Sequence, residues 1–379
     1  MTTPQVVAFP APLGVRSRFW NTTIMFAARL GLPTGLLHRI RYGSAARHLK
    51  LGRGAYVLCD SLAVRGSVSL GRRSKILALD VRLGSHIRID SDVQVFARSV
   101  VMDDNIIIDG SVEFGGMPLE QSRLEIGSGV WIFPHCVMNT TQGLTIGEGT
   151  GIGGYCLIWT HGSWQNYLDG FPVRFAPTRL GRNVWLPWHV IVMPGVTIGD
   201  NTTIAAGSVV VKDLPAHSFA AGTPAKVVKS GPDSWPGPQE KSRRDRLLEI
   251  TRHFTAWYGR AFDDWRPLTL LAKSPTARFS SEEPAGEFRW EDDGSGGLVI
   301  VLAPPAAAGA AGAADRLFVL DDAEAPPIES ASNWIDLRRG RYRLSSPRPL
   351  FRAYVAFLAN YGVRLAHAET GLLNSLGVK

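Results

Sequence analysis

Cysteine is scarce in this chain, and no apolar run is long. Three cysteines among 379 residues are too few for a disulfide framework, so we expect a reducing, cytoplasmic setting. The longest apolar run near the N-terminus, residues 24–37, is shorter than the ~20 residues of a membrane span and contains Arg29 and Pro33. The first fifteen residues lack the basic start and the apolar stretch of a signal peptide. We therefore expect neither a disulfide-rich nor a membrane-spanning protein.

Glycine is abundant, but it does not follow the period of a fibrous protein. The 40 glycines show no Gly-X-Y repeat, which favours turn-rich β-structure over a collagen-like chain. The net charge is +8, the arginines do not cluster with aromatic residues on one periodic face, and no nucleic-acid motif is present. Nucleic acid, anionic lipid and a polyphosphate-bearing small molecule would all suit a basic chain, and we favour a generally basic surface without a nucleic-acid partner.

Aliphatic residues recur every six residues through the middle of the chain. The clearest run is Leu180, Leu186, Val192, Ile198, Ile204 and Val210. A small or β-branched residue follows four positions after each of the first five, and weaker steps of six begin near residue 50. An α-helix has a period of 3.6 residues and a strand a period of 2, so neither explains this spacing.

A period of six fits a chain that turns a corner after each short strand, with three strands to a coil. The aliphatic residue then points into a three-sided prism, and Gly, Asn and Asp form the bends. Successive coils stack at about the ~4.8 Å spacing of paired strands. The repeat predicts a mainly β fold, a parallel β-helix built of hexapeptides.

The repeat also indicates the organisation of the chain. We expect an N-terminal helical cap over 1–49, the β-helix over 50–229, a linker over 230–244 and a small α/β domain over 245–379. Because the ends of a solenoid need caps, we favour capping over membrane-surface binding for the first part, and membrane association is not expected. In the last part, helices are predicted over 240–262 and 350–361, and strands over 298–302, 317–320 and 334–337.

Two excursions interrupt the six-residue step, over 113–123 and 162–179. Loops of the second length are usually functional. Its four aromatic residues, Trp164, Tyr167, Phe171 and Phe175, indicate that it packs against another surface.

Residues 183–228 carry the motifs VW, PGVTIGDN, AAGSVV-x-KD and AGTPAK in this order. In this stretch the chain resembles the hexapeptide-repeat acyltransferases, in particular the maltose, galactoside and xenobiotic acetyltransferase branch. The resemblance implies a left-handed β-helix, a homotrimer, acetyl-CoA or another acyl-CoA as cosubstrate, no metal, and a sugar-like acceptor, as in polysaccharide biosynthesis. Residues 333–366 resemble, more faintly, an accessory domain of some surface-polysaccharide acetyltransferases.

The resemblance assigns catalytic roles to three residues. His161, in IWTHGSW, matches the general base that removes a proton from a hydroxyl or amine as it attacks the thioester. Asn139 matches an asparagine that contacts the acceptor, or else is a corner residue in a left-handed turn. The backbone N–H of Trp188 takes the place of an oxyanion donor where the family has a small residue, so its indole narrows the thioester end or stacks on the acceptor. We expect Asn139 and His161 to point apart within one chain, so that each site needs two chains.

The resemblance also implies a CoA site. Lys212, Lys226 and Lys229 stand where the family places basic contacts to the CoA phosphates, and exposed lysines at a domain end are the alternative. Ala205 and Ala206 are small where the pantetheine arm runs close to the backbone.

Two other functions stay open at this point. His135, His161 and His189 each occupy the fourth position of a hexapeptide, which raises the alternative of a zinc-dependent lyase of the carbonic anhydrase type. We expect His135 and His189 to lie two coils apart on one face and His161 to lie on the next face. This spread is too wide for the three side chains to bind one ion. A non-catalytic scaffold is the other alternative. Cys136 and Cys156 are expected to be core residues rather than nucleophiles.

Overall fold

The computed structural model describes residues 15–117, 119–162, 166–234 and 242. Beyond these it describes 245–251, 253–254, 276–279, 286–292, 298–303, 315–320, 333–337, 341–344, 354–355, 358 and 366–367. The chain forms two compact units, Met1–Pro238 and Gln239–Lys379, and each is described by itself.

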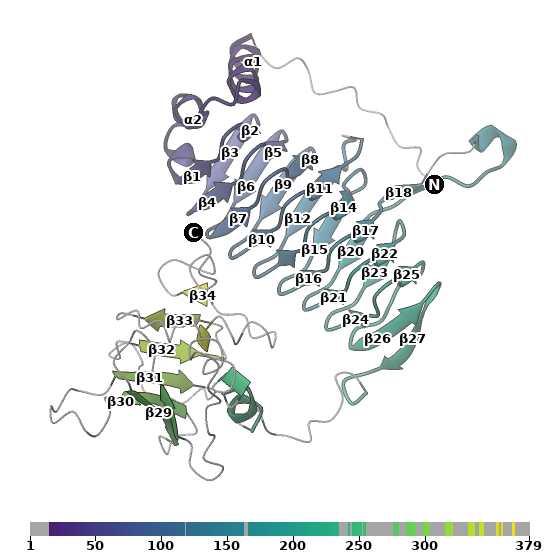
Figure 1. The fold of residues 1–379 in the computed structure, drawn as a ribbon. Coiled ribbons are helices and arrows are strands. Elements are labelled where there is room, and N and C mark those ends of the chain that lie inside the picture. Colours follow the sequence, from purple (N-terminus) through teal and green to yellow (C-terminus); the bar gives the residue numbers. More distant parts are fainter. Residues whose placement is uncertain are drawn as a thin grey trace. The chain divides into compact units, whose positions relative to one another are not determined.

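Three parallel sheets form the first unit and wind into a three-sided β-helix (Figure 1). Face A contains β1 (Leu49–Leu51), β4 (Val68–Leu70), β7 (Ile87–Ile89), β10 (Ile107–Ile108), β13 (Trp131–Ile132), β16 (Gly151–Ile152), β21 (Trp185–Leu186), β24 (Thr203–Ile204) and β26 (Ser218–Gly222). Face B contains β2 (Tyr56–Leu58), β5 (Lys75–Leu77), β8 (Gln94–Phe96), β11 (Glu113–Gly115), β14 (Val137–Asn139), β17 (Leu157–Ile158), β22 (Ile191–Val192) and β25 (Val209–Val210). Face C contains β3 (Ser61–Val64), β6 (Asp80–Leu83), β9 (Ser99–Met102), β12 (Arg123–Ile126), β15 (Leu144–Ile146), β20 (Thr178–Leu180) and β23 (Thr197–Ile198). The last face A strand, β26, pairs antiparallel with β27 (Ala225–Ser230). We number the coils from β1–β2–β3, so that coil 6 is β16–β17–β20.

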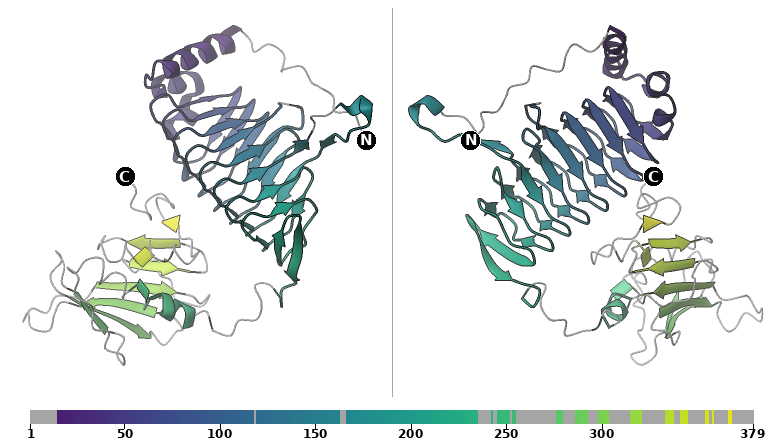
Figure 2. Two further views of the ribbon diagram at one scale, coloured as in Figure 1. Left: turned by 45° about the vertical axis from the view of Figure 1, so that its right-hand side comes forward. Right: turned by 180° about the vertical axis from the view of Figure 1, so that it is seen from behind.

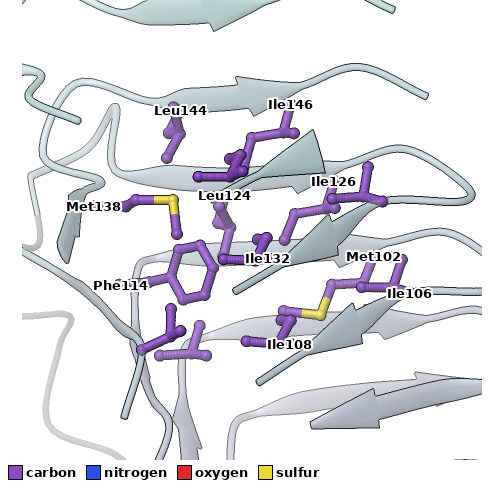
Figure 3. Packing of buried hydrophobic residues seen from close by; sticks show 14 of the residues in the cluster. Met102, Ile106, Ile108, Phe114, Leu124, Ile126, Ile132, Met138, Leu144 and Ile146 are labelled. Atoms are coloured by element: carbon purple, nitrogen blue, oxygen red, sulfur yellow. The ribbon is translucent and has the colours of Figure 1, made fainter. Parts of the chain in front are cut away.

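The aliphatic residues of the six-residue repeat fill the prism. Leu180, Leu186, Val192, Ile198 and Ile204 are all buried, and so are the equivalent residues of coils 2 to 5, whereas Leu51 and Val64 of coil 1 are partly buried. Figure 3 shows the middle of this core, where Phe114 of face B lies among the aliphatic side chains of neighbouring coils. The predicted fold class, a mainly β, left-handed parallel β-helix with a helical cap and a small further domain, is confirmed.

Residues in the left-handed region make two of the three corners. At the corner between faces A and B, φ lies between 58° and 74° at Gly54, Arg73, Asp92, Ser111, His135, Tyr155, His189 and Gly207. At the corner between faces C and A, φ lies between 53° and 71° at His86, Asn105, Gly129, Gly149, Asn183, Asn201 and His217. At each of these two corners, the left-handed residues of successive coils therefore form a column along one edge of the prism.

Two helices and a short 3-10 helix precede the first coil: α1 (Val15–Arg29), α2 (Gly35–Tyr42) and η1 (Gly43–His48). Figures 1 and 2 show them at the β1 end of the prism. Ile24, Ala27 and Ala28 of α1 are buried, so this part closes the first coil. Among the described residues, no helix is long and apolar enough to cross a membrane.

The first excursion is shorter than the sequence indicates, and the second begins and ends earlier in the chain. Residues 113–115 form β11 and Phe114 is buried, so the first excursion begins only after Gly115. The second leaves through β18 (His161–Gly162), contains η2 (Tyr167–Asp169), returns through β19 (Arg174–Phe175), and ends before Thr178. Tyr167, Leu168 and Phe171 are exposed, and Trp164 lies outside the described residues.

The second unit contains a seven-stranded sheet in chain order: β28 (Thr276–Phe279), β29 (Gly286–Asp292), β30 (Leu298–Ala303), β31 (Asp315–Leu320), β32 (Asn333–Asp336), β33 (Arg341–Leu344) and β34 (Ala366–His367). The three predicted strands correspond to β30, β31 and β32, whereas β28, β29, β33 and β34 were not predicted. Residues 245–251, 253–254, 354–355 and 358 are helical. The rings of Phe254 and Tyr354 pack edge to face, with centroids 5.0 Å apart. The segment 304–314 and most of 230–244 lie outside the described residues.

Candidate active site

His161 lies where the chain leaves the prism for the large excursion. It begins β18 and pairs with Phe175 of β19, and the two rings stack with centroids 5.7 Å apart. The ring of Trp159 meets the imidazole edge to face at 6.5 Å. Two aromatic rings therefore fix the imidazole at the base of the excursion.

The imidazole of His161 is partly removed from water. Its Nδ1 is buried and has no hydrogen-bond partner in the described part of the chain. Burial lowers the pKa of His161 below the ordinary value, because desolvation disfavours the imidazolium form. A neutral imidazole at neutral pH is the form that can accept a proton.

Asn139 lies in the same corner region as His161, one coil earlier. It ends β14, and its Oδ1 accepts hydrogen bonds from the Thr141 N–H (3.0 Å) and from the Thr160 hydroxyl (2.5 Å). Thr160 directly precedes His161 in the chain. The hydrogen bond from its hydroxyl therefore links Asn139 to the residue next to His161. The expectation that a single chain points them apart is wrong, because β14 and β17 pair in register and both lead into the same corner.

The Asn139 side chain is also well buried, with 6% of its surface exposed. The Thr160 hydroxyl, which donates to Asn139, also accepts a hydrogen bond from the Gln142 N–H at 3.1 Å. Asn139 therefore holds the corner from which His161 emerges. The sequence carried no signal for Thr160, because its role depends on a contact between coils.

Trp188 lies at the corner between faces A and B, on coil 7. Strand register places Gly153 and Gly154 directly beneath Pro187 and Trp188. A Cβ atom on Gly154 would lie 2.2 Å from the Trp188 indole, so the ring rests on the glycine backbone. The indole is 43% exposed. No group in the described residues accepts a hydrogen bond from the Trp188 amide N–H, whereas its carbonyl accepts one from Gly207 N–H at 3.0 Å.

A column of aromatic rings continues from Trp188 along this corner. Tyr155 stacks between His135 and His189, with centroid distances of 4.9 Å and 5.3 Å. The two histidines are two coils apart, as expected, and the tyrosine ring fills the space between them. His161 lies at a different corner. In the described part of the chain, no three His, Cys, Asp or Glu side chains converge as a metal site would require.

The candidate CoA residues lie at the C-terminal end of the prism. Ala205 and Ala206 occupy the corner of coil 8 next to Trp188, and the Ala205 N–H donates to the Ala220 carbonyl at 2.8 Å. Lys212 follows β25, and Lys226 and Lys229 lie on β27. All three lysines are exposed. Within one chain, Ala205 and Ala206 therefore lie across face B from His161, whereas Lys212 lies at the corner between faces B and C that His161 leaves two coils earlier.

Cys136 and Cys156 are fully buried in the prism. Their thiols approach the carbonyls of Gly153 and Pro187 at 3.0 Å and 2.9 Å. Both cysteines are core residues, as expected.

Comparison with known proteins places the coils that carry Trp188, Ala205 and Ala206 in a family. Residues 177–212, which run from the last strand of coil 6 into coil 8, match the family described as bacterial transferase hexapeptide (six repeats). This segment of the chain is built of hexapeptide repeats. The prism is the solenoid that such repeats build, and the matched segment holds Trp188, both alanines and Lys212.

Proteins similar to this chain carry names of acetyltransferases. It is 53% identical to the galactoside O-acetyltransferase of Escherichia coli over 53 residues, 14% of this chain and 26% of that protein. It is 35% identical over 107 residues to the E. coli protein WcaF, named for acetyl transfer in colanic acid biosynthesis, which is 28% of this chain and 58% of that protein. The chain thus matches less than two thirds of the length of either relative.

Among solved structures, a hexapeptide-repeat acetyltransferase of Vibrio cholerae in complex with acetyl coenzyme A is similar at 18% identity and a TM-score of 0.30. That match covers 59% of this chain and 92% of the other.

Proposed function

We propose that this hexapeptide-repeat protein is a CoA-dependent acyltransferase that moves an acetyl group to a hydroxyl or amine of a sugar or sugar-containing acceptor. The observation that carries the proposal is His161, a desolvated imidazole held between two aromatic rings at the base of a projecting loop. The names of the relatives support the reaction class, and those of two of them support a glycan acceptor.

The proposed reaction is a direct attack without an acyl-enzyme. The acceptor oxygen or nitrogen attacks the thioester carbonyl while the His161 imidazole takes its proton. The Trp188 amide N–H, unpaired within the described residues, donates to the oxyanion of the tetrahedral intermediate. Collapse of the intermediate breaks the carbon–sulfur bond, and the imidazolium returns the proton to the CoA thiolate.

In this proposal the donor runs along the C-terminal coils. Ala205 and Ala206 leave room for the pantetheine arm beside the corner, and Lys212, Lys226 and Lys229 neutralise the phosphates. Exposed ammonium groups on β27 and after β25 suit a ligand that carries several negative charges.

We also propose a homotrimer. His161 and Trp188 lie at different corners of one prism, so a second copy would have to place its corner against the first to complete the site. Light scattering measures this directly, and a monomer that turns over acetyl-CoA would contradict the shared site.

The reaction is tested by CoA thiol release from acetyl-CoA with a panel of sugars, sugar nucleotides and oligosaccharides, followed by mass spectrometry of the acceptor. We expect the mass of one acceptor class to rise by that of an acetyl group that replaces a hydrogen. Absence of turnover over the whole panel, with intact acetyl-CoA, would favour the scaffold alternative.

The pH profile provides a first prediction. Because burial lowers the pKa of His161, the neutral base persists to a pH below about 6.5, the ordinary value. We expect kcat/KM for the acceptor to be constant above about pH 6.5 and to fall only at lower pH as the imidazole is protonated. An acid limb centred clearly above that value would assign the profile to another group.

Charge reversal at Lys212 provides a second prediction. In Lys212→Glu, a carboxylate replaces a charge-assisted contact to phosphate, so we expect the KM for acetyl-CoA to rise roughly 10–100-fold with the acceptor KM unchanged. The matched control is Arg82→Glu, an exposed reversal on face C, which should leave both constants unchanged. An unaltered donor KM in Lys212→Glu would place the phosphates elsewhere.

A further inference from the structure

Polar contacts attach α2 of the N-terminal cap to the β-helix. His38 of α2 is buried, and its Nε2 accepts the Val57 N–H at 3.0 Å while its Nδ1 donates to the Thr34 carbonyl at 2.8 Å. Arg41 donates to the Cys59 carbonyl at 2.7 Å, and the Tyr42 hydroxyl accepts the Cys59 N–H at 3.1 Å. The inner side of α2 is therefore the polar side.

The outer side of the cap is apolar instead. Six large apolar side chains on or beside α1 and α2 are between 49% and 69% exposed: Phe19, Phe26, Leu30, Leu32, Leu36 and Ile40. On α1, Phe19 and Phe26 are seven residues apart, and on α2, Leu36 and Ile40 are four apart, so each pair lies on one helix face. We call these six residues the outer apolar face. The outer apolar face is not needed to cap the prism, because Ile24, Ala27 and Ala28 close the first coil.

The charge of the protein is concentrated in the same segment. The first 59 residues contain eight Lys and Arg residues and no Asp or Glu. Since the whole chain has 41 basic and 33 acidic residues, the rest of the sequence carries equal numbers of each. The net charge of +8 therefore belongs to the cap and the start of the first coil.

We propose that the outer apolar face docks on the surface of an anionic lipid bilayer. Helices that lie in a membrane interface combine a large apolar stripe with basic residues and few acidic ones. Phe and Leu side chains enter the boundary between head groups and acyl chains, and each nearby Arg or Lys adds attraction to anionic lipid. Charge complementarity favours such a surface over a neutral one. The proposal does not depend on the acyltransferase reaction.

The test is flotation of the full chain with vesicles of phosphatidylcholine alone or mixed with phosphatidylglycerol. We expect binding to the anionic vesicles, weaker binding as salt is raised, and little binding to phosphatidylcholine. In Phe26→Gln/Leu36→Gln, we expect partition to fall at least about tenfold, because two exposed apolar side chains no longer enter the lipid. In Arg29→Gln/Arg39→Gln, the preference for phosphatidylglycerol should weaken.

Two variants outside the cap serve as controls. Leu168→Gln removes an apolar side chain that is 91% exposed in the large excursion, and Arg82→Gln removes an exposed charge on face C. Both should bind vesicles like the unchanged protein. Equal binding by the Phe26→Gln/Leu36→Gln variant, or no binding to anionic vesicles, would overturn the proposal. Loss of oligomers in that variant without any lipid binding would overturn it too and assign the face to a second copy.

Discussion

His161→Ala is expected to reduce turnover by ~10²–10⁴-fold, the usual contribution of a general base. The acceptor must lose its proton as it attacks, and without the imidazole only water can take it. The loss should appear in kcat, with the KM for acetyl-CoA unchanged, since the change leaves every residue assigned to the donor in place. Steady-state kinetics, together with calorimetric measurement of CoA binding, separates an effect on kcat from an effect on donor binding.

The control for this variant is His86→Asn. His86 is another corner histidine with φ of 59°, on an early coil, and Asn tolerates the left-handed region. This change should leave kcat unaltered. If His161→Ala retained activity within a factor of about three, that outcome would remove His161 from the mechanism.

Gly147→Ala is expected to destabilise the β-helix by about 3 kcal/mol. A Cβ atom at this position would lie 2.4 Å from both the carbonyl carbon and oxygen of Gly181 on the next coil. Backbone cannot move aside as a side-chain tip can, so the two coils must separate or the paired strands must shift. The measurement is the unfolding midpoint in urea, followed by far-ultraviolet circular dichroism.

Gly35→Ala provides the comparison for that variant. Gly35 begins α2 with no atom within 4 Å of an added Cβ, and alanine is the better helix former. We expect an unchanged or slightly higher midpoint. Equal midpoints for the two variants would mean that coil stacking tolerates the extra methyl group.

The six-residue repeat was sufficient to predict the architecture because it is a local pattern with a single geometric solution. Each aliphatic residue from Leu180 to Val210 is buried at the predicted step. The repeat is weaker around the first excursion, and there the prediction was wrong, because Phe114 replaces the usual aliphatic residue and the strand was taken for loop. In the second unit, β29 was missed because charged residues recur through it, and β28 was missed because it has only four residues with a single large apolar side chain.

The candidate site was predictable only where the motifs are contiguous. His161 and Trp188 could be placed by their motifs, and their roles stay predictions. The hydrogen bond from Thr160 to Asn139 and the fit of the Trp188 indole over Gly154 join residues 21 and 34 positions apart. Such contacts follow from the pairing of neighbouring coils, and only the second of them spans the excursion between β17 and β20. A sequence motif carries no record of that pairing.

The stacking of coils also fixes the distances between sites along the axis of the prism. His161 leaves coil 6, and five coil steps separate it from the coil that the helical cap covers. At ~4.8 Å for each step, the imidazole stands roughly 25 Å along the axis from the cap. If the cap lies on a bilayer, the number of coils sets how far beyond the lipid head groups an acceptor must extend to be acylated. A coil gained or lost would change that reach by one strand spacing and leave the chemistry of the site as it is.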